Sequence, residues 1–455
     1  MTRILLRLGR LVSIFCLVFT GQSVLAQTVS NPTPLDFQIE TFVLSNGLQV
    51  VVMPSNRAPI VTQMLLYRVG SADEESGKSG LAHFLEHLLF KATKNYPVGF
   101  YDQQIHSVGG QMNAFTTQDY TVYHQTVASN FLELIMQLEA DRMENLIIEE
   151  PGFSAEKQVV REEIRQNHID PPSSQLYSMM QAVLFLHHPY GRPVIGWDHE
   201  VNQLTAQDAL EFYQRWYAPN NAILMIIGDV KTDQVRLLAN KYYGRIPAKS
   251  NLKPLNRLSD PPLNMPRRID FNSDKNQDFR WQRFYKIEFT TKIDSIPAEL
   301  LAEILGGNSN SRLYKRLVIE DKLASSVSAY LDTSYRDYAV FSIYVTALRR
   351  ENYDRIEQII NQEIDAIKNT PVTQEEIQRA QTSVDNAIIK SRDDLTNLGE
   401  YVLIGLATGW QLNDLQTWST KMRMIDAKTI QLHAQQFLKL ENAVTGTLSP
   451  KLTVE

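Results

Sequence analysis

The sequence has a single cysteine, Cys16, among its 455 residues. Cys16 lies in a short apolar stretch near the N-terminus that we expect to be removed, so the mature chain would contain neither thiols nor disulfides. A chain of this length without cross-links has to gain its stability from a large buried core. Its content of 43% hydrophobic residues is consistent with such a core.

The chain also lacks an excess of basic residues and any block rich in lysine or arginine. Its formal net charge is −6 at pH 7, whereas nucleic-acid binding normally needs a clustered positive surface. We therefore expect no nucleic-acid partner. Charged residues make up 21% of the chain, which is an average proportion and argues against wholesale disorder.

No apolar run is long enough to span a bilayer, which takes about 20 residues. The most apolar stretch, Leu11–Phe19, is short, follows three arginines and precedes small residues that end at Ala26. This order is typical of a secretory signal peptide rather than a membrane anchor. We predict that residues 1–26 are removed and that the mature protein is exported to the periplasm without a membrane span.

Prolines divide the rest of the chain. Residues 27–36 are polar with two prolines and predict a flexible lead. Residues 247–266 contain five prolines among polar residues and predict an interdomain linker. We therefore expect a first domain over residues 37–246 and a second over residues 267–449.

The first predicted domain mixes strand and helix patterns. Phe42–Val52 predicts a hairpin whose turn lies at Asn46 and Gly47. Ser79 is of a residue type that commonly caps a helix N-terminus, and the apolar spacing after it predicts a helix to about Thr93.

The second predicted domain repeats the first in outline. Tyr338–Thr346 predicts a strand followed by a helix, as Tyr120–Val127 does. Arg283–Phe289 predicts a strand in the place of Met64–Val69, but the next segment, Leu305–Leu317, contains no histidine. We therefore expect two similar halves of mixed strand and helix, of which one bears chemistry.

Two of the nine histidines lie four residues apart in G-L-A-H-F-L-E-H-L-L-F. His83 and His87 lie on adjacent turns of the predicted helix, so both imidazoles can reach one ion, and Glu86 lies beside them. Imidazole is a good zinc ligand, and a nearby carboxylate can accept a proton at such a site. The alternative is two histidines satisfied by ordinary hydrogen bonds, but the H-x-x-E-H spacing favours a metal site.

A catalytic zinc site normally has a third protein ligand. Ala155–Asn167 predicts a helix on which Glu156 and Glu163 lie two turns apart on one face. Glu162 is turned by about 100° from Glu163, so only one of these two carboxylates can reach the ion. Acidic residues on a helix most often form a solvated face, and it is the upstream histidine pair that makes these residues candidates.

Together these segments resemble the pitrilysin/insulinase-type zinc metallopeptidases, most of all the mitochondrial-processing-peptidase branch and its bacterial relatives. The resemblance runs from about Phe37 to about Ser449. It rests on H-F-L-E-H, G-G-Q-M-N-A-F-T-T, E-K-Q-V-V-R-E-E-I, H-P-Y-G-R-P-V-I-G-W and Y-A-P-N-N-A. The family implies an α+β fold of two homologous halves, each a mostly antiparallel sheet covered by helices, which enclose a cavity.

The resemblance also implies roles for single residues. One zinc ion per chain would be held by His83, His87 and Glu163, with Glu156 as a helper. Glu162 is the nearest competitor for the third ligand. Glu86 would be the general base that accepts a proton from the attacking water and passes it to the leaving amine.

Asn113, Ala114 and Phe115 match the family's substrate-binding edge strand. There the peptide adds as an extra strand, held mainly by backbone hydrogen bonds. The other histidines show no ligand spacing, and we expect them to be structural or surface residues; they are His106, His124, His168, His187, His188, His199 and His433.

One segment departs from the family's pattern. Active members carry an arginine and a tyrosine seven residues apart, in the half without zinc or on a partner subunit. Here Val318 and Ser325 hold these positions, and Tyr314 and Arg316 lie nearby in a different register. The implied activity is that of a zinc endopeptidase subunit that cuts peptides or unfolded polypeptides.

A homologous partner without H-x-x-E-H would supply the missing arginine and tyrosine to this subunit in trans. The alternative is a non-catalytic subunit of the same fold that binds or scaffolds polypeptides. Such members typically lose part of the zinc motif, and here the motif is complete.

Overall fold

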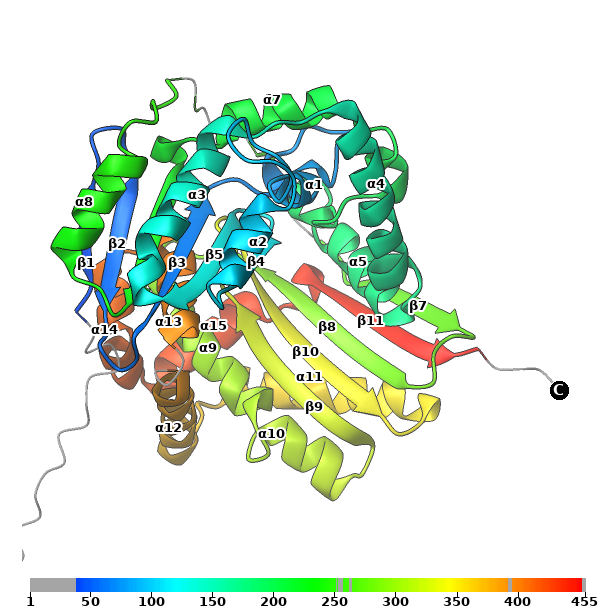
Figure 1. The fold of residues 1–455 in the computed structure, drawn as a ribbon. Coiled ribbons are helices and arrows are strands. Elements are labelled where there is room, and N and C mark those ends of the chain that lie inside the picture. Colours follow the sequence, from blue (N-terminus) through cyan, green and yellow to red (C-terminus); the bar gives the residue numbers. More distant parts are fainter. Residues whose placement is uncertain (1–37, 251, 253–256, 262–263, 392–394, 452–455) are drawn as a thin grey trace, which may run out of the picture. The chain divides into compact units, whose positions relative to one another are not determined.

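The computed structural model describes residues 38–451 except 251, 253–256, 262–263 and 392–394 (Figure 1). The predicted signal peptide and flexible lead lie outside the described residues. Between α8 (Thr232–Tyr242) and β7 (Arg267–Ser273), the described residues form no helix or strand. The predicted linker falls in this region, and the domain boundaries stay predictions.

The first sheet contains six strands in the order β1-β2-β6-β3-β5-β4 (Figure 1). Neighbouring strands are antiparallel except β2 and β6, which are parallel. Strand β4 therefore lies at one edge and pairs with β5 alone. The strands are β1 (Glu40–Val43), β2 (Gln49–Pro54), β3 (Ile60–Tyr67), β4 (Gln111–Thr116), β5 (Thr121–Ala128) and β6 (Ala222–Gly228).

The second sheet contains five strands in the order β7-β11-β8-β10-β9, with β7 and β11 parallel and the other neighbours antiparallel. Numbered along the chain, this is the order and direction of β2-β6-β3-β5-β4. The predicted repeat is thus confirmed, and β8 takes the place of β3 as expected. The remaining strands are β8 (Phe279–Ile287), β9 (Ala324–Asp332), β10 (Ala339–Ala347) and β11 (Ala443–Pro450).

Helices follow the strands in a similar sequence in both halves, except that α8 follows β6 while no described helix follows β11. The first half contains α1 (Leu81–Leu88), α2 (Phe100–Ser107), α3 (Leu132–Asn145), α4 (Glu150–Ile164), α5 (Pro172–Leu184), α6 (Asp198–Val201), α7 (Ala206–Trp216) and α8. The second contains α9 (Ile296–Ala302), α10 (Arg312–Tyr314), α11 (Tyr353–Asn369), α12 (Gln374–Ser391), α13 (Leu395–Thr408), α14 (Leu412–Arg423) and α15 (Ala427–Phe437). The expected α+β fold of two homologous halves, each a mostly antiparallel sheet with helices, is confirmed.

A large hydrophobic cluster of the first half fixes the position of α1. Phe84 and Leu85 are fully buried and belong to the same cluster as Val52, Leu65 and Tyr123 of the sheet. Burying one large apolar side chain contributes about 1.5–3 kcal/mol. The apolar side of α1 is therefore held firmly, and its polar residues occupy a defined place.

Helix α5 lies between the two halves in sequence and in contacts. It follows α4 of the first half, but it packs against β7, β8 and β11 of the second sheet. Leu176, Met180 and Leu184 of α5 form a buried cluster with Phe284 and Leu448 of that sheet. Side chains from both halves consequently face the space beside the end of α4.

The start of the predicted histidine helix was wrong. Helix α1 begins at Leu81 with Gly80 as its N-cap, not Ser79, and it ends at Leu88 rather than near Thr93. Gly80 has φ +87° in the left-handed region, and a Cβ at this position would lie 2.4 Å from the Ile195 carbonyl oxygen. The Ser79 hydroxyl instead accepts a hydrogen bond from the Trp197 N–H at 2.9 Å.

The predicted hairpin is confirmed, since β1 and β2 pair antiparallel across a turn in which Gly47 has φ +86°. None of the helices in the described part of the chain combines the length and the apolar character needed to cross a bilayer.

Candidate metal centre

The two histidines of α1 lie side by side on its polar face. The centroids of their rings are 4.8 Å apart, as expected for residues four apart on a helix. Leu81, Leu85 and Leu88 are buried on the apolar side of the same helix. The amphipathic pattern of α1 therefore directs His83 and His87 together away from the core.

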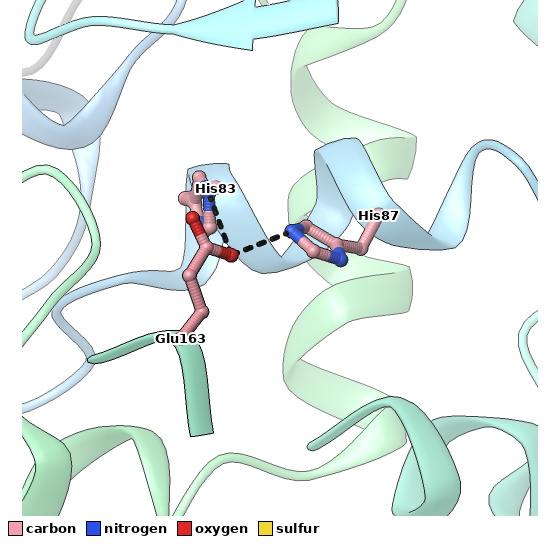
Figure 2. Close-up of side chains that lie close together, drawn as sticks. All are labelled: His83, His87 and Glu163. Atoms are coloured by element: carbon pink, nitrogen blue, oxygen red, sulfur yellow. Dashed lines mark ion pairs between the residues drawn. The ribbon is translucent and has the colours of Figure 1, made fainter. Parts of the chain in front are cut away.

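Helix α4 brings Glu163 to both imidazoles (Figure 2). Glu163 Oε2 lies 3.4 Å from His87 Nε2 and 3.9 Å from His83 Nε2. One candidate ligand atom from each of the three residues lies within 4.8 Å of the other two. Ligand atoms bound tetrahedrally to zinc at about 2.0–2.2 Å lie roughly 3.3–3.5 Å apart. Small side-chain movements would therefore bring the three candidate ligand atoms to the separations that a zinc ion requires.

Glu156, two turns before Glu163, contacts the opposite side of one imidazole. Its Oε1 lies 2.8 Å from His87 Nδ1, and its Oε2 lies 2.6 Å from the Lys91 ammonium. A carboxylate at Nδ1 keeps the proton on that nitrogen and leaves Nε2 free to bind a metal. Glu156 is thus placed to orient His87 rather than to bind the ion.

Glu162, the competing candidate for the third ligand, points elsewhere. It is exposed, and its two oxygens accept hydrogen bonds from Nε and Nη2 of Arg165 at 2.9 and 2.5 Å. The geometry therefore favours Glu163 as the ligand. The roles of these residues stay predictions.

Charges at the centre are distributed unequally between the two imidazoles. Burial and the neighbouring His87 lower the pKa of His83 to about 4. Burial also disfavours the cationic form of His87, but hydrogen bonds to Glu156 and Glu163 outweigh it and raise the pKa of His87 to about 9. Two carboxylates thus surround one imidazolium, an arrangement in which a divalent cation can replace the proton.

Glu86 is almost fully buried, with 9% of its surface exposed, next to the histidines on α1. Thr116 Oγ1 donates a hydrogen bond to Glu86 Oε2 at 2.6 Å. Burial raises the pKa of Glu86 above its usual value, and the bond from Thr116 partly opposes this. A carboxylate with a raised pKa is a suitable group for accepting a proton and passing it on.

Thr116 is the last residue of β4, the edge strand predicted to bind substrate. Asn113, Ala114 and Phe115 all lie on β4, whose outer edge pairs with no other described strand. Helix α1 packs against this strand. The candidate base and the open strand edge are therefore adjacent.

A carboxylate that sequence reasoning missed caps α1. Glu74 is buried, and its two oxygens accept hydrogen bonds from the N–H groups of Gly80 at 3.0 Å and Ala82 at 2.8 Å. Burial raises the pKa of Glu74 to about 8. No helix periodicity connects Glu74 to α1, so the sequence held no direct signal for this cap.

A pocket of about 370 Å³ adjoins the metal centre and is lined from both halves. His83 and Glu163 line it on one side, and Asp332 and Tyr335 of the second half line it on another. His168, expected to be structural or on the surface, also lines this pocket. Its position depends on a π-helical turn, η3 (Arg165–Ile169), that continues α4, and the sequence pattern does not reveal such a turn.

The two positions that depart from the family's pattern lie outside this pocket. Val318 lies in the π-helical segment η8 (Lys315–Glu320) and packs against the core of the second half. Ser325 is exposed on β9, where its hydroxyl donates to the Thr346 carbonyl at 3.3 Å. Nearby, Arg316 forms ion pairs with Glu320 and Asp321.

Family profiles match both halves of the chain. A profile described as insulinase (peptidase family M16) matches residues 50–198, and one described as the peptidase M16 inactive domain matches residues 203–384. The first profile contains the candidate metal centre, and the second contains the second sheet except β11.

Similar proteins extend over nearly the whole chain. The zinc protease PqqE of Helicobacter pylori is 29% identical over 90% of this chain and 93% of its own. An uncharacterized zinc protease of Mycobacterium leprae is 31% identical over 77% of this chain and 78% of its own. The crystal structure of a protease from Helicobacter pylori superposes with a TM-score of 0.85 at 27% identity, covering 91% of this chain and 100% of that one.

Proposed function

The chain belongs to the insulinase family of peptidases (family M16), and we propose that it is the zinc-dependent catalytic subunit of an endopeptidase. The observation that carries this proposal is the convergence of His83, His87 and Glu163 beside the buried carboxylate of Glu86. Two nitrogen donors and one carboxylate are a donor set typical of catalytic zinc, which leaves a further position open.

Zinc bound by these three residues would polarise a water molecule and the scissile carbonyl of a peptide. Glu86 would accept a proton from the attacking water at its carboxylate and pass it to the leaving amine. Thr116 would hold that carboxylate in place through its hydrogen bond. Glu156 would fix the tautomer of His87 from the side that faces away from the ion.

An extended peptide would add to the open edge of β4 along Asn113, Ala114 and Phe115. Backbone hydrogen bonds at a strand edge bind many sequences, because they do not depend on the side chains. The bond between Thr116 and Glu86 sets the distance from this edge to the base. We therefore propose peptides and unfolded polypeptides as the substrates.

A homologous partner would complete the site. Val318 packs against apolar residues and Ser325 bonds to its own sheet, and neither side chain could bind a substrate carbonyl as an arginine and a tyrosine would. We propose that a subunit with this pair and without H-x-x-E-H supplies it in trans. The N-terminal segment, with its signal-peptide features, supports export of the mature chain to the periplasm.

The test uses the purified mature chain with and without such a homologue from the same genome. Zinc per chain and the cleavage of an unstructured peptide are measured in both samples. We expect about one zinc per chain in both and rapid cleavage only with the homologue. Full cleavage by the chain alone, unchanged by any homologue, would contradict the trans arrangement.

The same measurement separates the alternative function. A non-catalytic subunit that binds polypeptides would retain the peptide without cutting it, even when the homologue is present and zinc is bound. That result would contradict the catalytic proposal as a whole.

A further inference from the structure

An arginine of the predicted linker joins three segments that lie far apart in the sequence. The Arg257 guanidinium donates to Asp73 Oδ1 at 3.0 Å and to Asp337 Oδ2 at 2.8 Å. It also donates to Asp119 Oδ1. The side chain of Arg257 is only 5% exposed, and a buried charge is tolerated only when it is paired and hydrogen-bonded. We call Arg257 and its three carboxylates the linker hub.

Direct hydrogen bonds between the two halves surround the linker hub. The buried Tyr190 hydroxyl donates to Asp119 Oδ2 at 2.6 Å and accepts a hydrogen bond from the Asp337 N–H at 3.0 Å. The N–H of Arg336 donates to Asp119 Oδ2 at 2.8 Å. The halves therefore meet at the hub through backbone groups as well as charges, and the hub holds them in one relative position.

The first carboxylate of the hub leads to the helix that carries the histidines. Asp73 ends a short 3₁₀ turn, and the next residue is Glu74. Glu74 caps α1 through the N–H groups of Gly80 and Ala82. Since His83 directly follows Ala82, the position of Asp73 bears on the turn of α1 from which this candidate ligand projects.

The second carboxylate leads to the candidate base. Asp119 lies in the turn between β4 and β5, where its N–H donates to Thr117 Oγ1 at 3.2 Å. The residue before this turn, Thr116, bonds to Glu86. The Ser71 N–H also donates to the Thr117 carbonyl at 3.0 Å, which joins this turn to the segment of the first carboxylate. The hub thus holds the end of the open strand edge together with the start of α1.

The third carboxylate belongs to the second half. Asp337 lies in the loop between β9 and β10. Ser334 and Tyr335 of the same loop line the pocket of about 370 Å³, across which His83 and Glu163 lie. The hub therefore sets how far this wall of the pocket stands from the candidate metal ligands.

We propose that Arg257 is a positioning residue for peptide cleavage, which holds Glu86, the open edge of β4 and the second-half wall of the pocket in one arrangement. This role rests on the proposed peptidase function. The hydrogen bonds of Arg257 go to none of the candidate metal ligands, so zinc should still bind when Arg257 is replaced. The loss should instead appear in kcat, because a displacement of about 1 Å far from the chemistry can slow a reaction about 100-fold.

The experiment measures kcat and KM per zinc-loaded, folded chain, with the partner subunit present where cleavage requires one. In Arg257→Met we expect about one zinc per chain, a kcat lower by about 10–100-fold and a KM within about threefold of the wild type. KM should change little because the open edge of β4 still offers its backbone groups to the peptide. Arg257→Lys should recover part of the lost kcat, since an ammonium keeps the charge but lacks the fork that bonds to several carboxylates.

Arg283→Met is the matched control. Arg283 is also fully buried, and it joins β8 to α11 within the second half through Glu357 and Asn361, at 2.6 Å each. Both variants lose a buried ion pair, so both should lower the melting temperature. Only Arg257→Met should lower kcat per zinc-loaded chain, which separates positioning from a purely structural role.

The outcomes also separate this role from the proposed function. Equal kcat values in Arg257→Met and Arg283→Met, or loss of zinc from Arg257→Met, would overturn the positioning role alone. If Arg257→Met does not fold, Asp337→Asn decides, because this carboxylate is 28% exposed and joins only the second half to the hub; its kcat should fall about threefold or more, and an unchanged kcat would overturn the role. A wild-type complex that binds zinc and cuts no peptide would overturn the proposed function and the role with it.

Discussion

Helices α1 and α9 occupy the same place in the two halves of the molecule. Each follows the strand that lies third in the shared order, β3 or β8, and each packs against the edge strand of its own sheet, β4 or β9. The next pair of helices also corresponds, because α4 contacts α1 and α12 contacts α9. The backbone therefore offers similar positions in both halves.

The side chains at these positions differ. Helix α1 carries His83, Glu86 and His87, whereas α9 is apolar except for Glu299, which accepts a hydrogen bond from Ser295. On α12, Glu376 forms a salt bridge with Arg312 at 2.6 Å. The helix α9 beside it contains no histidine that a carboxylate could orient. A shared fold thus fixes where a metal centre can lie, and a few residues decide whether it exists.

The largest expected effect comes from making the first half resemble the second. Glu163→Gln removes one of three ligands, so we expect zinc to fall from about one per chain towards zero and cleavage to be lost. Zinc content after dialysis and peptide cleavage are the measurements. Glu162→Gln, one residue away and paired with Arg165, is the control and should keep both. If the two variants exchanged these results, the third ligand would be Glu162.

A smaller effect separates metal binding from proton transfer within α1. Glu86→Gln keeps the size of the side chain but cannot accept the proton, so we expect cleavage to fall by about 10²–10⁴-fold. Zinc should be retained, because Glu86 is not among the three converging ligands. Full cleavage by this variant would exclude Glu86 as the base, and loss of zinc would make its role structural.

Glu156→Gln should have a weaker effect, limited to the orientation of one ligand. The variant loses the carboxylate that bonds to His87 Nδ1 at 2.8 Å, and loss of such a partner typically costs 10–100-fold in metal affinity or activity. Zinc affinity is measured by competition with a chelator. Glu150→Gln, at the exposed start of the same helix, is the control. An unchanged affinity in Glu156→Gln would contradict the orienting role.

Periodic spacing in the sequence predicted that His83 and His87 share one helix face. The choice of Glu163 over Glu162 as their partner came from the family resemblance. Residues four or seven apart on a helix share a face whatever the rest of the chain does. The repeat of the two halves in outline was predicted from local apolar patterns such as those of β3 and β8, whereas the order of the strands depends on pairing between distant segments.

The missed features depend on distant contacts. Gly80 replaces Ser79 as the cap because the Ile195 carbonyl leaves no room for a side chain, and Glu74 supplies the capping bonds from another segment. His168 reaches the pocket only through a π-turn. None of these features has a period in the sequence, so they appear only when the elements are packed together.

The smallest effect per step, about tenfold for each pH unit, concerns the proton of His87 and distinguishes the two ligands on α1. The pKa of His87 is raised to about 9, whereas that of His83 is lowered to about 4. Between pH 6 and 8 the metal-free protein therefore holds a proton on His87 and none on His83, and zinc must displace that one proton. Zinc affinity should accordingly rise about tenfold per pH unit and level off near the pKa of His87.

Competition with a chelator at pH 6, 7 and 8 measures this slope, after correction for the chelator's own protonation. Glu156→Gln should flatten it, because the hydrogen bond to Glu156 is one of the interactions that raise the pKa of His87. A flat profile in the wild type would mean that His87 is already neutral, and a slope of two protons would mean that His83 also carries one. Either result would revise the unequal charge distribution and leave the three-ligand geometry unchanged.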